Sequence, residues 1–413
     1  MRLFGISIII TVLIILASCK GTLHEDYPDP YTNPGSVIML SGDWFGHPHD
    51  INFDNLPELP HEHSVVSDVR DSGSDHQSFT EAMSSGGVNQ HSYLTFYDGK
   101  LWVMWSDGPG VEDRVGQVVK YATSIDGVIW TDPEFLTPYP PDSDPESPHY
   151  NTRTDQGFRW ISRGFWQREG ELLALASLDE AAGFFGQGLE LRAFRWDKDK
   201  MLWEDGGRVF DNTINNFPPK PLPTGEWMMS RREFDYSEKG VHFIVGGIDA
   251  IDQWESFPVF GSESELAAEE PYWWILPDGK SLMALFRDNR RSGYLYRSFS
   301  VDNGRTWSLP VRTNFPDARS KFNGLRLSDG RYVLVSNPNP EKRDPLAISI
   351  SDDGMVFTRM GYLTGGRHVD YPHVMEHEGY LYVAFAGSVK QMIEVIKIRI
   401  SDLDKLDMAQ YGF

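Results

Sequence analysis

Pairs of alternating apolar runs, each pair joined by a short polar turn that contains a glycine, recur along most of the chain. Two examples are YLTFYDGKLWVMW around Gly99 and VMEHEGYLYVAF around Gly379. This order of strand, tight turn and strand is typical of a β-hairpin, because Asp-Gly and similar pairs adopt the backbone angles that a two-residue turn needs. Further hairpins are predicted around Gly170, Gly225, Gly279 and Gly330.

The spacing of these turns indicates a repeat. Successive turn glycines lie 71, 55, 54, 51 and 49 residues apart. A period near 50 residues, with room for four short strands in each unit, is typical of a β-propeller. We therefore predict an all-β fold, a six-bladed β-propeller with four-stranded antiparallel blades, over residues 36–413. Only ESELAAEE at 263–270 has a composition that allows a turn of helix.

The chain before the first hairpin is less regular. The apolar run SVIMLS at 36–41 is a strand candidate, and we predict that it completes the sixth blade, where the C-terminal unit needs a partner to close the ring. Residues 43–90 are expected to pack around the first blade.

A second repeated pattern follows strand-like runs. The segment SFSVDNGRTWSLP at 298–310 places turn-forming Asp302 and Gly304 between a serine and a tryptophan. Aspartate accepts hydrogen bonds from backbone amides a few residues on, and glycine supplies a positive φ. SIDGVIW at 124–130 and SDDGMVF at 351–357 repeat the pattern, and RWDKDKMLW at 195–203 is a weaker copy. We interpret these segments as clamps between the third and fourth strands of their blades.

Charge and composition narrow the range of functions. The formal net charge is −22, from 38 basic and 60 acidic residues, and no basic stripe runs along the chain. Nucleic acid is therefore excluded as a partner, since binding to phosphates needs a cationic surface. The 13 Trp and 17 Tyr residues suit an all-β fold, and they also suit sugar binding, where ring faces stack on pyranose C–H groups. We predict a glycan or oligosaccharide substrate, no cofactor and a monomeric protein.

The first residues, MRLFGISIIITVLIILASCK, read as a secretory signal with a short apolar core. The end of this segment, Leu-Ala-Ser-Cys, resembles a bacterial lipobox, in which Cys19 becomes the lipidated first residue. Cys19 is the only cysteine, so an internal disulfide is excluded. A transmembrane anchor and an ordinary cleaved signal are the alternatives. We expect residues 1–19 to be the signal and lipobox, residues 20–35 a flexible tether, and the exported protein to be held at the bacterial cell envelope only by lipid.

The clamps and the hairpins together resemble the sialidase superfamily, in which Ser-x-Asp-x-Gly-x-Thr-Trp segments on a six-bladed propeller are called Asp boxes. The resemblance covers the chain from about Gln90 onward. It implies that the Asp boxes are structural and lie away from the active site. It also implies an exo-acting glycoside hydrolase that releases a terminal, acidic sugar.

Propeller geometry predicts which residues form the active face, because the starts of the inner strands and the ends of the second strands meet at one end of the channel. The turn glycines mark the opposite end. The rim so defined contains arginines, whose planar guanidinium groups bind carboxylates in a bidentate manner. Its candidate substrate-binding residues are Arg159, Arg232, Arg287, Asp288, Asn323 and Arg343. In the resemblance, Arg287 and Arg343 match two of the three carboxylate-binding arginines of sialidases.

The resemblance also implies catalytic residues. Tyr371 matches the nucleophilic tyrosine, and Glu270 matches the glutamate that helps it to ionise, a help that a phenol with a pKa of about 10 needs at neutral pH. The first blade departs from the family pattern, because Gln90-His91-Ser92-Tyr93 stands where sialidases have Arg-Ile-Pro. The acid/base residue is not assigned, and Asp107 and Asp155 are both candidates.

Two other functions remain open at this point. A uronate lyase on the same propeller would use His91 to remove a proton beside the carboxylate, with Arg159 holding the carboxylate and Tyr371 assisting. A propeller that has lost catalysis would bind glycans only. The pairs His47/His49 and His61/His63 have a spacing that could ligate zinc, but no third ligand follows, so we predict no metal site.

Overall fold

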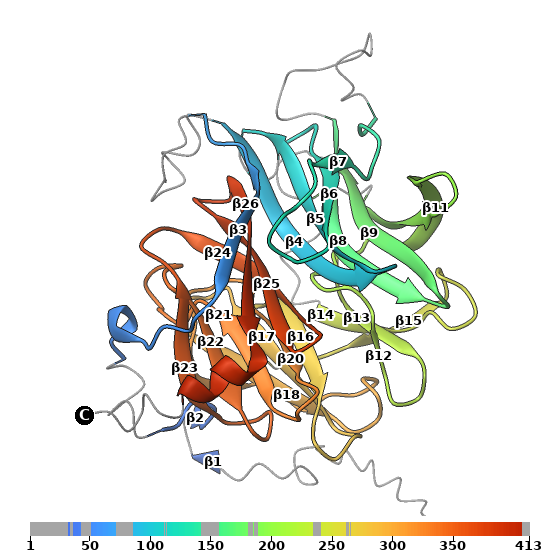
Figure 1. Cartoon of the computed structure of the whole chain (residues 1–413). Helices are drawn as coiled ribbons and strands as arrows, with labels where there is room; N and C mark the ends of the chain where they lie inside the picture. The colour runs from blue at the N-terminus through green and yellow to red at the C-terminus, as the bar shows by residue number, and fades with distance from the viewer. Residues whose placement is uncertain are drawn as a thin grey trace, which may run out of the picture.

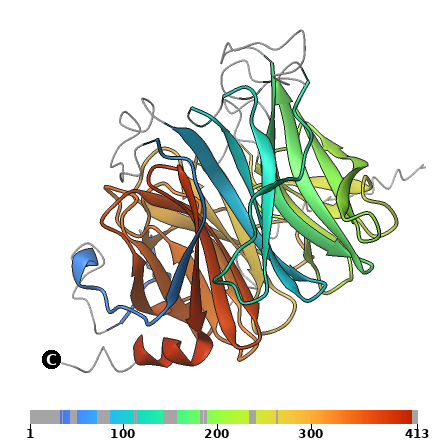
Figure 2. The ribbon, with the colours of Figure 1, turned by 45° about the horizontal axis from the view of Figure 1, so that its top comes forward.

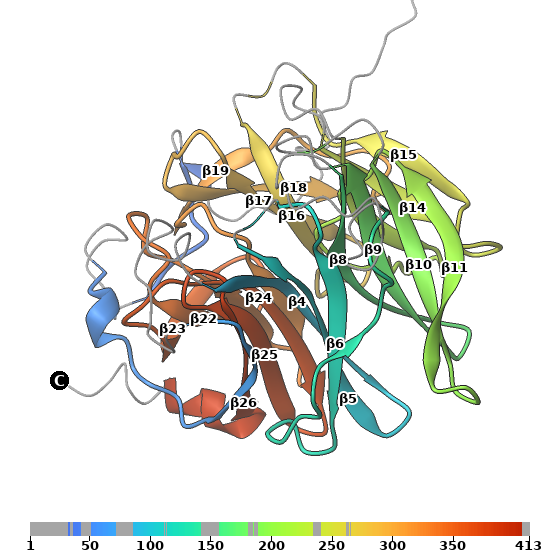
Figure 3. The same ribbon diagram turned by 90° about the horizontal axis from the view of Figure 1, so that it is seen from above.

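Six antiparallel sheets surround a common axis in the computed structural model of the chain, and they follow one another around the ring in chain order (Figures 1 and 3). The structure describes residues 32–33, 36–42, 51–71, 86–110, 112, 114–141, 157–180, 185, 189–233, 241–261, 264 and 266–406. The predicted signal, most of the predicted tether, Cys19, Asp155 and the His47/His49 pair lie outside these residues. The helices of the described part include none long and apolar enough to cross a membrane.

The first three blades each contain four strands. Blade one is β4 (Gly87–Tyr97), β5 (Lys100–Pro109), β6 (Val118–Ser124) and β7 (Glu134–Phe135). Blade two is β8 (Phe158–Arg168), β9 (Glu171–Glu180), β10 (Glu190–Asp197) and β11 (Leu202–Asp211). Blade three is β12 (Lys220–Pro221), β13 (Trp227–Arg232), β14 (Val241–Gly246) and β15 (Trp254–Pro258).

The last three blades complete the ring. Blade four is β16 (Ala268–Ile275), β17 (Leu282–Asp288), β18 (Tyr294–Ser300) and β19 (Val311–Pro316). Blade five is β20 (Asn323–Arg326), β21 (Tyr332–Ser336), β22 (Leu346–Ser351) and β23 (Phe357–Thr364). Blade six is β24 (Val369–His377), β25 (Tyr380–Gly387), β26 (Met392–Arg399) and β3 (Glu62–Asp68). The six-bladed, four-stranded prediction is confirmed, and each predicted turn glycine joins the first two strands of its blade.

The strand that closes the ring differs from the prediction. β3 lies beside β26 as the outer strand of blade six, visible as a blue strand against red ones (Figures 1 and 2). The predicted segment 36–41 instead contributes β2 (Ser36–Val37), which pairs with β19 of blade four and with β1 (Thr32–Asn33). β3 therefore belongs to blade six, although its Val66 side chain also packs with Leu94 and Leu101 of blade one, as expected for part of 43–90. An edge strand is selected by shape and long-range pairing, which local apolar content does not specify.

Helical structure is confined to short pieces in the described residues. A 3-10 turn, η2, spans Phe53–Asn55, and η3 (Ile400–Asp404) follows the last strand. The helical turn that composition allowed at 263–270 is not formed by its last residues, because Ala268–Glu270 begin β16. These residues pair with β17, and this pairing satisfies the hydrogen-bonding groups of their backbone in place of a helix.

The Asp boxes form the predicted clamps between third and fourth strands. In the box after β18, the Ser300 hydroxyl donates to Asp302 Oδ1 at 2.8 Å, and the same carboxylate oxygen accepts the amide of Thr306 at 2.9 Å. The indole of Trp307 donates to the carbonyl of Gly304 at 2.9 Å. The boxes at Asp126 and Asp353 repeat the serine-to-aspartate bond. These turns therefore hold blade edges together.

Candidate active site

Three inner strands carry the same local irregularity, and it shapes the candidate site. In β4, β16 and β24 the pairing register shifts by one residue, at 90–93, 269–272 and 370–373. The first extra residue of each bulge has a positive φ: 54° at His91, 47° at Glu270 and 59° at Tyr371. Bulges re-aim a side chain at a local cost in backbone energy, and they are common beside active sites. Here they turn three chemically active side chains toward one cavity.

This cavity has a volume of about 300 Å³, and its residues His91, Glu270 and Tyr371 lie in the part of each inner strand away from the hairpin turn. It is lined by His91, Glu112, Ile161, Arg163, Phe185, Ile214, Asn216, Glu269, Glu270, Arg287, Asn289, Arg319, Arg343, Tyr371 and Lys390. Five of these side chains are cationic and three are carboxylates. The cavity is therefore locally cationic in a protein whose net charge is −22.

Tyr371 lies at the centre of a polar cluster. Its hydroxyl donates to Glu112 Oε1 at 3.4 Å, and the Lys390 ammonium lies 4.0 Å from its ring centroid. The ring stacks on His91 with centroids 4.9 Å apart. Burial raises the pKa of Tyr371, as do the charges of Glu112 and Glu270, whereas Lys390 acts in the opposite direction. The phenol is therefore protonated at neutral pH before a substrate arrives.

His91 is buried, and its Nδ1 atom has no hydrogen-bond partner among the described residues. Burial lowers its pKa well below the ordinary value, and the nearby cations Lys321 and Arg163 lower it further. The imidazole is therefore neutral at pH 7, with a nitrogen able to act as an acceptor.

Glu270 and Arg287 form a buried ion pair, and Arg287 also contacts Glu269 at 2.9 Å. Burial by itself would raise the pKa of Glu270, but Arg287, Lys321 and Arg343 outweigh it and lower that pKa. The Glu270 carboxylate is therefore held ionised inside the cavity. Glu269 in turn binds Arg232 at 2.8 Å.

Arg343 is held from two sides. It donates to Asp370 Oδ2 at 2.6 Å and to the backbone carbonyl of Arg319 at 2.7 Å. Burial opposes ionisation of Asp370, but Lys390, His368 and Arg343 outweigh it and lower the pKa of Asp370. Arg343 therefore lies against a permanent anion, with its other face toward the Tyr371 ring, 5.5 Å from the centroid.

Arg319 differs from its neighbours. Among the described residues its guanidinium has no hydrogen bond or ion pair, although it lines the cavity and is only partly exposed. Burial lowers the pKa of Arg319, and the charges of Arg291, Arg287 and Arg343 lower it further. The Glu269 carboxylate acts in the opposite direction but makes no ion pair with Arg319, so the guanidinium can bind an anion that enters the cavity.

The structure brings together five of the sequence-predicted residues and leaves four outside the cavity lining. His91, Glu270, Arg287, Arg343 and Tyr371 line the cavity. Arg159 is fully buried against Asp179, at 2.7 Å. Arg232 supports Glu269, Asp288 accepts the amides of Arg290 and Ser292, and Asn323 Oδ1 accepts the amide of Val374.

Sequence reasoning missed Glu112, Arg163, Arg319 and Lys390. Glu112, Arg319 and Lys390 lie in segments that connect strands. Arg163 lies on β8, one residue after the position that aligns with His91 and Tyr371. The run Ser388–Lys390 has three consecutive positive φ values, of 48°, 57° and 63°, although none of the three residues is a glycine.

Of the two acid/base candidates that the sequence left open, Asp107 pairs with Lys120 at 2.9 Å. His63 pairs with Glu394 at 2.7 Å, and no cluster of three potential metal ligands occurs in the described part.

Comparison with known proteins agrees with the propeller fold. A family model described as a BNR repeat-like domain matches residues 194–383. No curated protein matches the sequence significantly. Among solved structures, a protein titled "Sialidase" is 20% identical with a TM-score of 0.59, over 88% of this chain and 35% of that chain.

Two other solved structures cover most of both chains. A protein of unknown function from Dyadobacter fermentans is 16% identical, with a TM-score of 0.57 over 82% of this chain and 99% of its own. The intramolecular trans-sialidase from Ruminococcus gnavus is 12% identical, with a TM-score of 0.59 over 76% and 95%. The chain spans about a third of the length of the first sialidase. The chain shares the six-bladed propeller fold of these structures, and residues 194–383 are similar to a BNR repeat-like domain.

Proposed function

We propose that the protein is an exo-acting glycoside hydrolase that releases a terminal acidic sugar from a glycan. The observation that carries the proposal is the set of matched bulges, which turn Tyr371 and Glu270 into the cavity that Arg287, Arg319 and Arg343 line. A nucleophile, carboxylates and a cluster of guanidinium groups are the groups that cleavage of such a sugar requires.

The sugar carboxylate is held by the three arginines in this proposal. Arg287 and Arg343 are already paired with Glu270 and Asp370, which fixes their orientation. Arg319 has its guanidinium available, and it takes the place of the arginine that the first blade lacks. The preference for an acidic sugar follows from the excess of cations around the cavity.

The reaction begins at Tyr371. Its hydroxyl gives a proton to Glu112, the carboxylate that it already contacts, as its oxygen attacks the anomeric carbon and the glycosidic C–O bond breaks. The leaving oxygen departs on the opposite face of the sugar and takes a proton from solvent, while Glu112 keeps its proton for return to the phenol oxygen. Lys390 stabilises negative charge on the phenol oxygen, and Glu270 stabilises positive charge that develops on the sugar. Water then attacks the anomeric carbon and releases the sugar, and the phenol oxygen regains its proton.

A uronate lyase is the second candidate, favoured by the neutral His91 stacked on a protonated Tyr371. In that reaction His91 takes the proton beside the carboxylate, and the glycosidic oxygen leaves with the proton of Tyr371. No water is consumed, and the sugar gains a C=C bond.

One experiment separates these functions. The protein is incubated with sialylated, uronate-containing and rhamnose-capped glycans, and the products are followed by mass and by ultraviolet absorbance. A saturated acidic sugar, lost in Glu112→Gln and Tyr371→Phe and retained in His91→Gln, supports the hydrolase. An unsaturated product that depends on His91 supports the lyase. Binding without either product leaves a glycan-binding propeller and overturns both reactions.

A further inference from the structure

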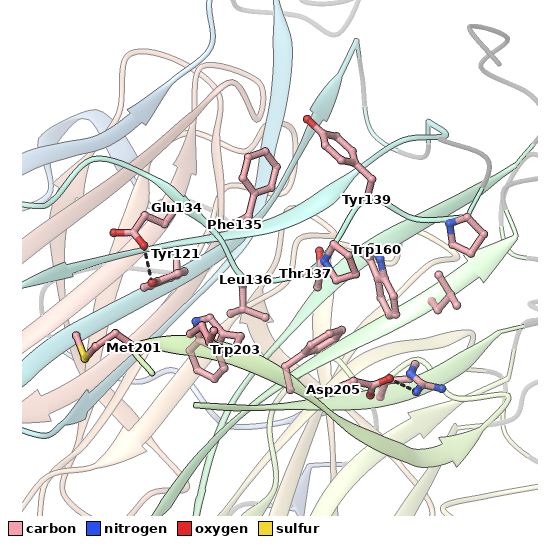
Figure 4. A pocket seen from close by; sticks show the side chains of 16 residues that line it. Tyr121, Glu134, Phe135, Leu136, Thr137, Tyr139, Trp160, Met201, Trp203 and Asp205 are labelled. Atoms are coloured by element: carbon pink, nitrogen blue, oxygen red, sulfur yellow. Dashed lines mark hydrogen bonds and ion pairs between the residues drawn. The ribbon is translucent and has the colours of Figure 1, made fainter. Parts of the chain in front are cut away.

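A second cavity lies on the flank of the propeller, between blades one and two, and the proposed reaction makes no use of it. Its volume is about 650 Å³, which is in the range of small-molecule sites. Figure 4 shows its walls: Phe135 and Tyr139 come from β7 and the segment after it, Trp203 and Asp205 come from β11, and Met201 comes from the turn before β11. The two walls thus belong to different blades, with Trp160 of β8 between them.

Exposed apolar side chains gather at this cavity. Ten large apolar side chains are exposed in the described part of the chain, and four of them line it: Phe135, Tyr139, Met201 and Leu202, at 52%, 44%, 61% and 43%. Leaving such groups in water costs free energy, so their concentration in one concave place favours a bound partner. The rings of Phe135 and Tyr139 lie 5.4 Å apart at 52°, which presents ring faces in two directions.

Fixed polar groups stand beside these rings. Glu134 Oε2 accepts the Tyr121 hydroxyl at 2.9 Å, and Arg192 donates to Asp205 at 2.6 Å. Each carboxylate is thereby held in one orientation and keeps lone pairs that can accept from hydroxyl groups. Aromatic faces for C–H groups and planar acceptors for hydroxyl groups are the two requirements of a pyranose ring.

Charge decides which kind of sugar fits. The lining has two carboxylates, Glu134 and Asp205, and one cation, Arg192, which is already paired with Asp205 and Glu190. An anionic sugar would meet repulsion here, in contrast to the cationic cavity around Arg319. A protein partner is disfavoured because stable interfaces bury about 800 Å² on each side, which is a broad surface and not a small cavity.

We propose that this flank cavity is a second glycan site, which binds one or two neutral pyranose units by stacking on Tyr139, Phe135 and Trp203. The flank cavity and the cavity around Tyr371 lie on opposite faces of β8, because Trp160 lines the first, its neighbour Ile161 lines the second, and successive side chains of a strand point to opposite faces. The proposal does not rest on the proposed reaction, since it concerns binding alone.

The test is calorimetric titration of the protein with lactose, cellobiose, maltose and N-acetyllactosamine, each to about 10 mM, a range suited to affinities near 1 mM. At least one disaccharide is expected to bind, with affinity reduced about tenfold in Tyr139→Ala and in Met201→Ala. Ile248→Ala removes a side chain of similar exposure that lies outside both cavities, so it serves as the matched control and leaves the affinity unchanged.

Several outcomes overturn the proposal. One is the absence of binding by all four sugars, and another is equal affinity in wild type and Tyr139→Ala. Binding that is lost in Arg319→Ala and kept in Tyr139→Ala would place the sugar in the catalytic cavity instead. Failure of the proposed reaction is seen separately, as absence of product from acidic glycans, and it leaves this titration unaffected.

Discussion

The phenol ring of Tyr371 stacks on the imidazole ring of His91, with the two planes inclined at 24°. The residues are 280 positions apart in the chain, and they meet because blade six closes against blade one. Lys390 contacts the same phenol ring, so both a neutral imidazole and an ammonium group lie against the ring whose hydroxyl is proposed to react. Each of the following predictions tests one part of this arrangement or of its support.

Replacing Tyr371 by Phe tests the nucleophile. Phenylalanine keeps the ring that stacks on His91 and loses only the hydroxyl, so we expect kcat on an acidic glycan to fall about 10³-fold. Because the packing is retained, the melting temperature should change by no more than about 2 °C. Steady-state kinetics and thermal unfolding measure the two quantities. A variant that keeps wild-type kcat would remove Tyr371 from the reaction.

Replacing Arg319 by Ala tests the carboxylate site. We expect KM for an acidic glycan to rise about 10- to 100-fold, the effect of losing a charge-assisted hydrogen bond to the sugar carboxylate. Stability should stay the same or rise, since a cation repelled by Arg287 and Arg343 is removed. The exposed Arg326, changed to Ala, is the matched control. Loss of stability together with an unchanged KM would mean that Arg319 is structural.

Lys321 provides a prediction about pH. Its ammonium is fully buried and donates to the Tyr93 hydroxyl at 2.7 Å, and burial lowers its pKa to about 7. An unfolded lysine has a pKa of about 10.4, so between these two values the unfolded chain binds more protons than the folded one. Lys321 therefore increases the free energy of unfolding by a few kcal/mol as pH rises from about 7 to about 10.

Lys321→Met removes this titration and keeps an apolar stem. Chemical denaturation of wild type and variant at several pH values between 7 and 10 should show a less positive slope of stability against pH in the variant. Equal slopes would show that Lys321 titrates alike in both states. The exposed Lys405, changed to Met, controls for the loss of a positive charge.

Asp302→Ala tests the structural role of an Asp box. The change removes the acceptor of the Ser300 hydroxyl, the Thr306 hydroxyl and two backbone amides. We expect a loss of about 1–3 kcal/mol in the free energy of unfolding, with kcat and KM unchanged, because the turn lies away from the cavity. The exposed Asp249, changed to Ala, should leave both quantities unaltered. A fall in kcat in a folded Asp302 variant would contradict a purely structural role.

The hairpins and the Asp boxes could be predicted because their determinants are local. Turn pairs such as Asp98-Gly99 set the backbone angles between two alternating runs, and Asp302 binds amides within four residues of itself. His91 and Tyr371 could be aligned for the same reason, since each lies eight residues before its turn glycine, and Glu270 lies one residue outside this register, nine before Gly279. Arg319 and Lys390 could not be found in this way, because they come from connections whose paths depend on neighbouring blades.

The amino-acid sequence by itself determined the fold class, the number of blades, the clamps, and the three bulge residues that face the channel. These features depend on apolar alternation and turn chemistry, which act over a few residues. Only the tertiary structure decided that β3 closes blade six, that Arg159 forms a buried ion pair with Asp179, and that Glu112 and Arg319 line the cavity. Ring closure, charge pairing and burial act between residues far apart in the chain, so no local pattern can specify them.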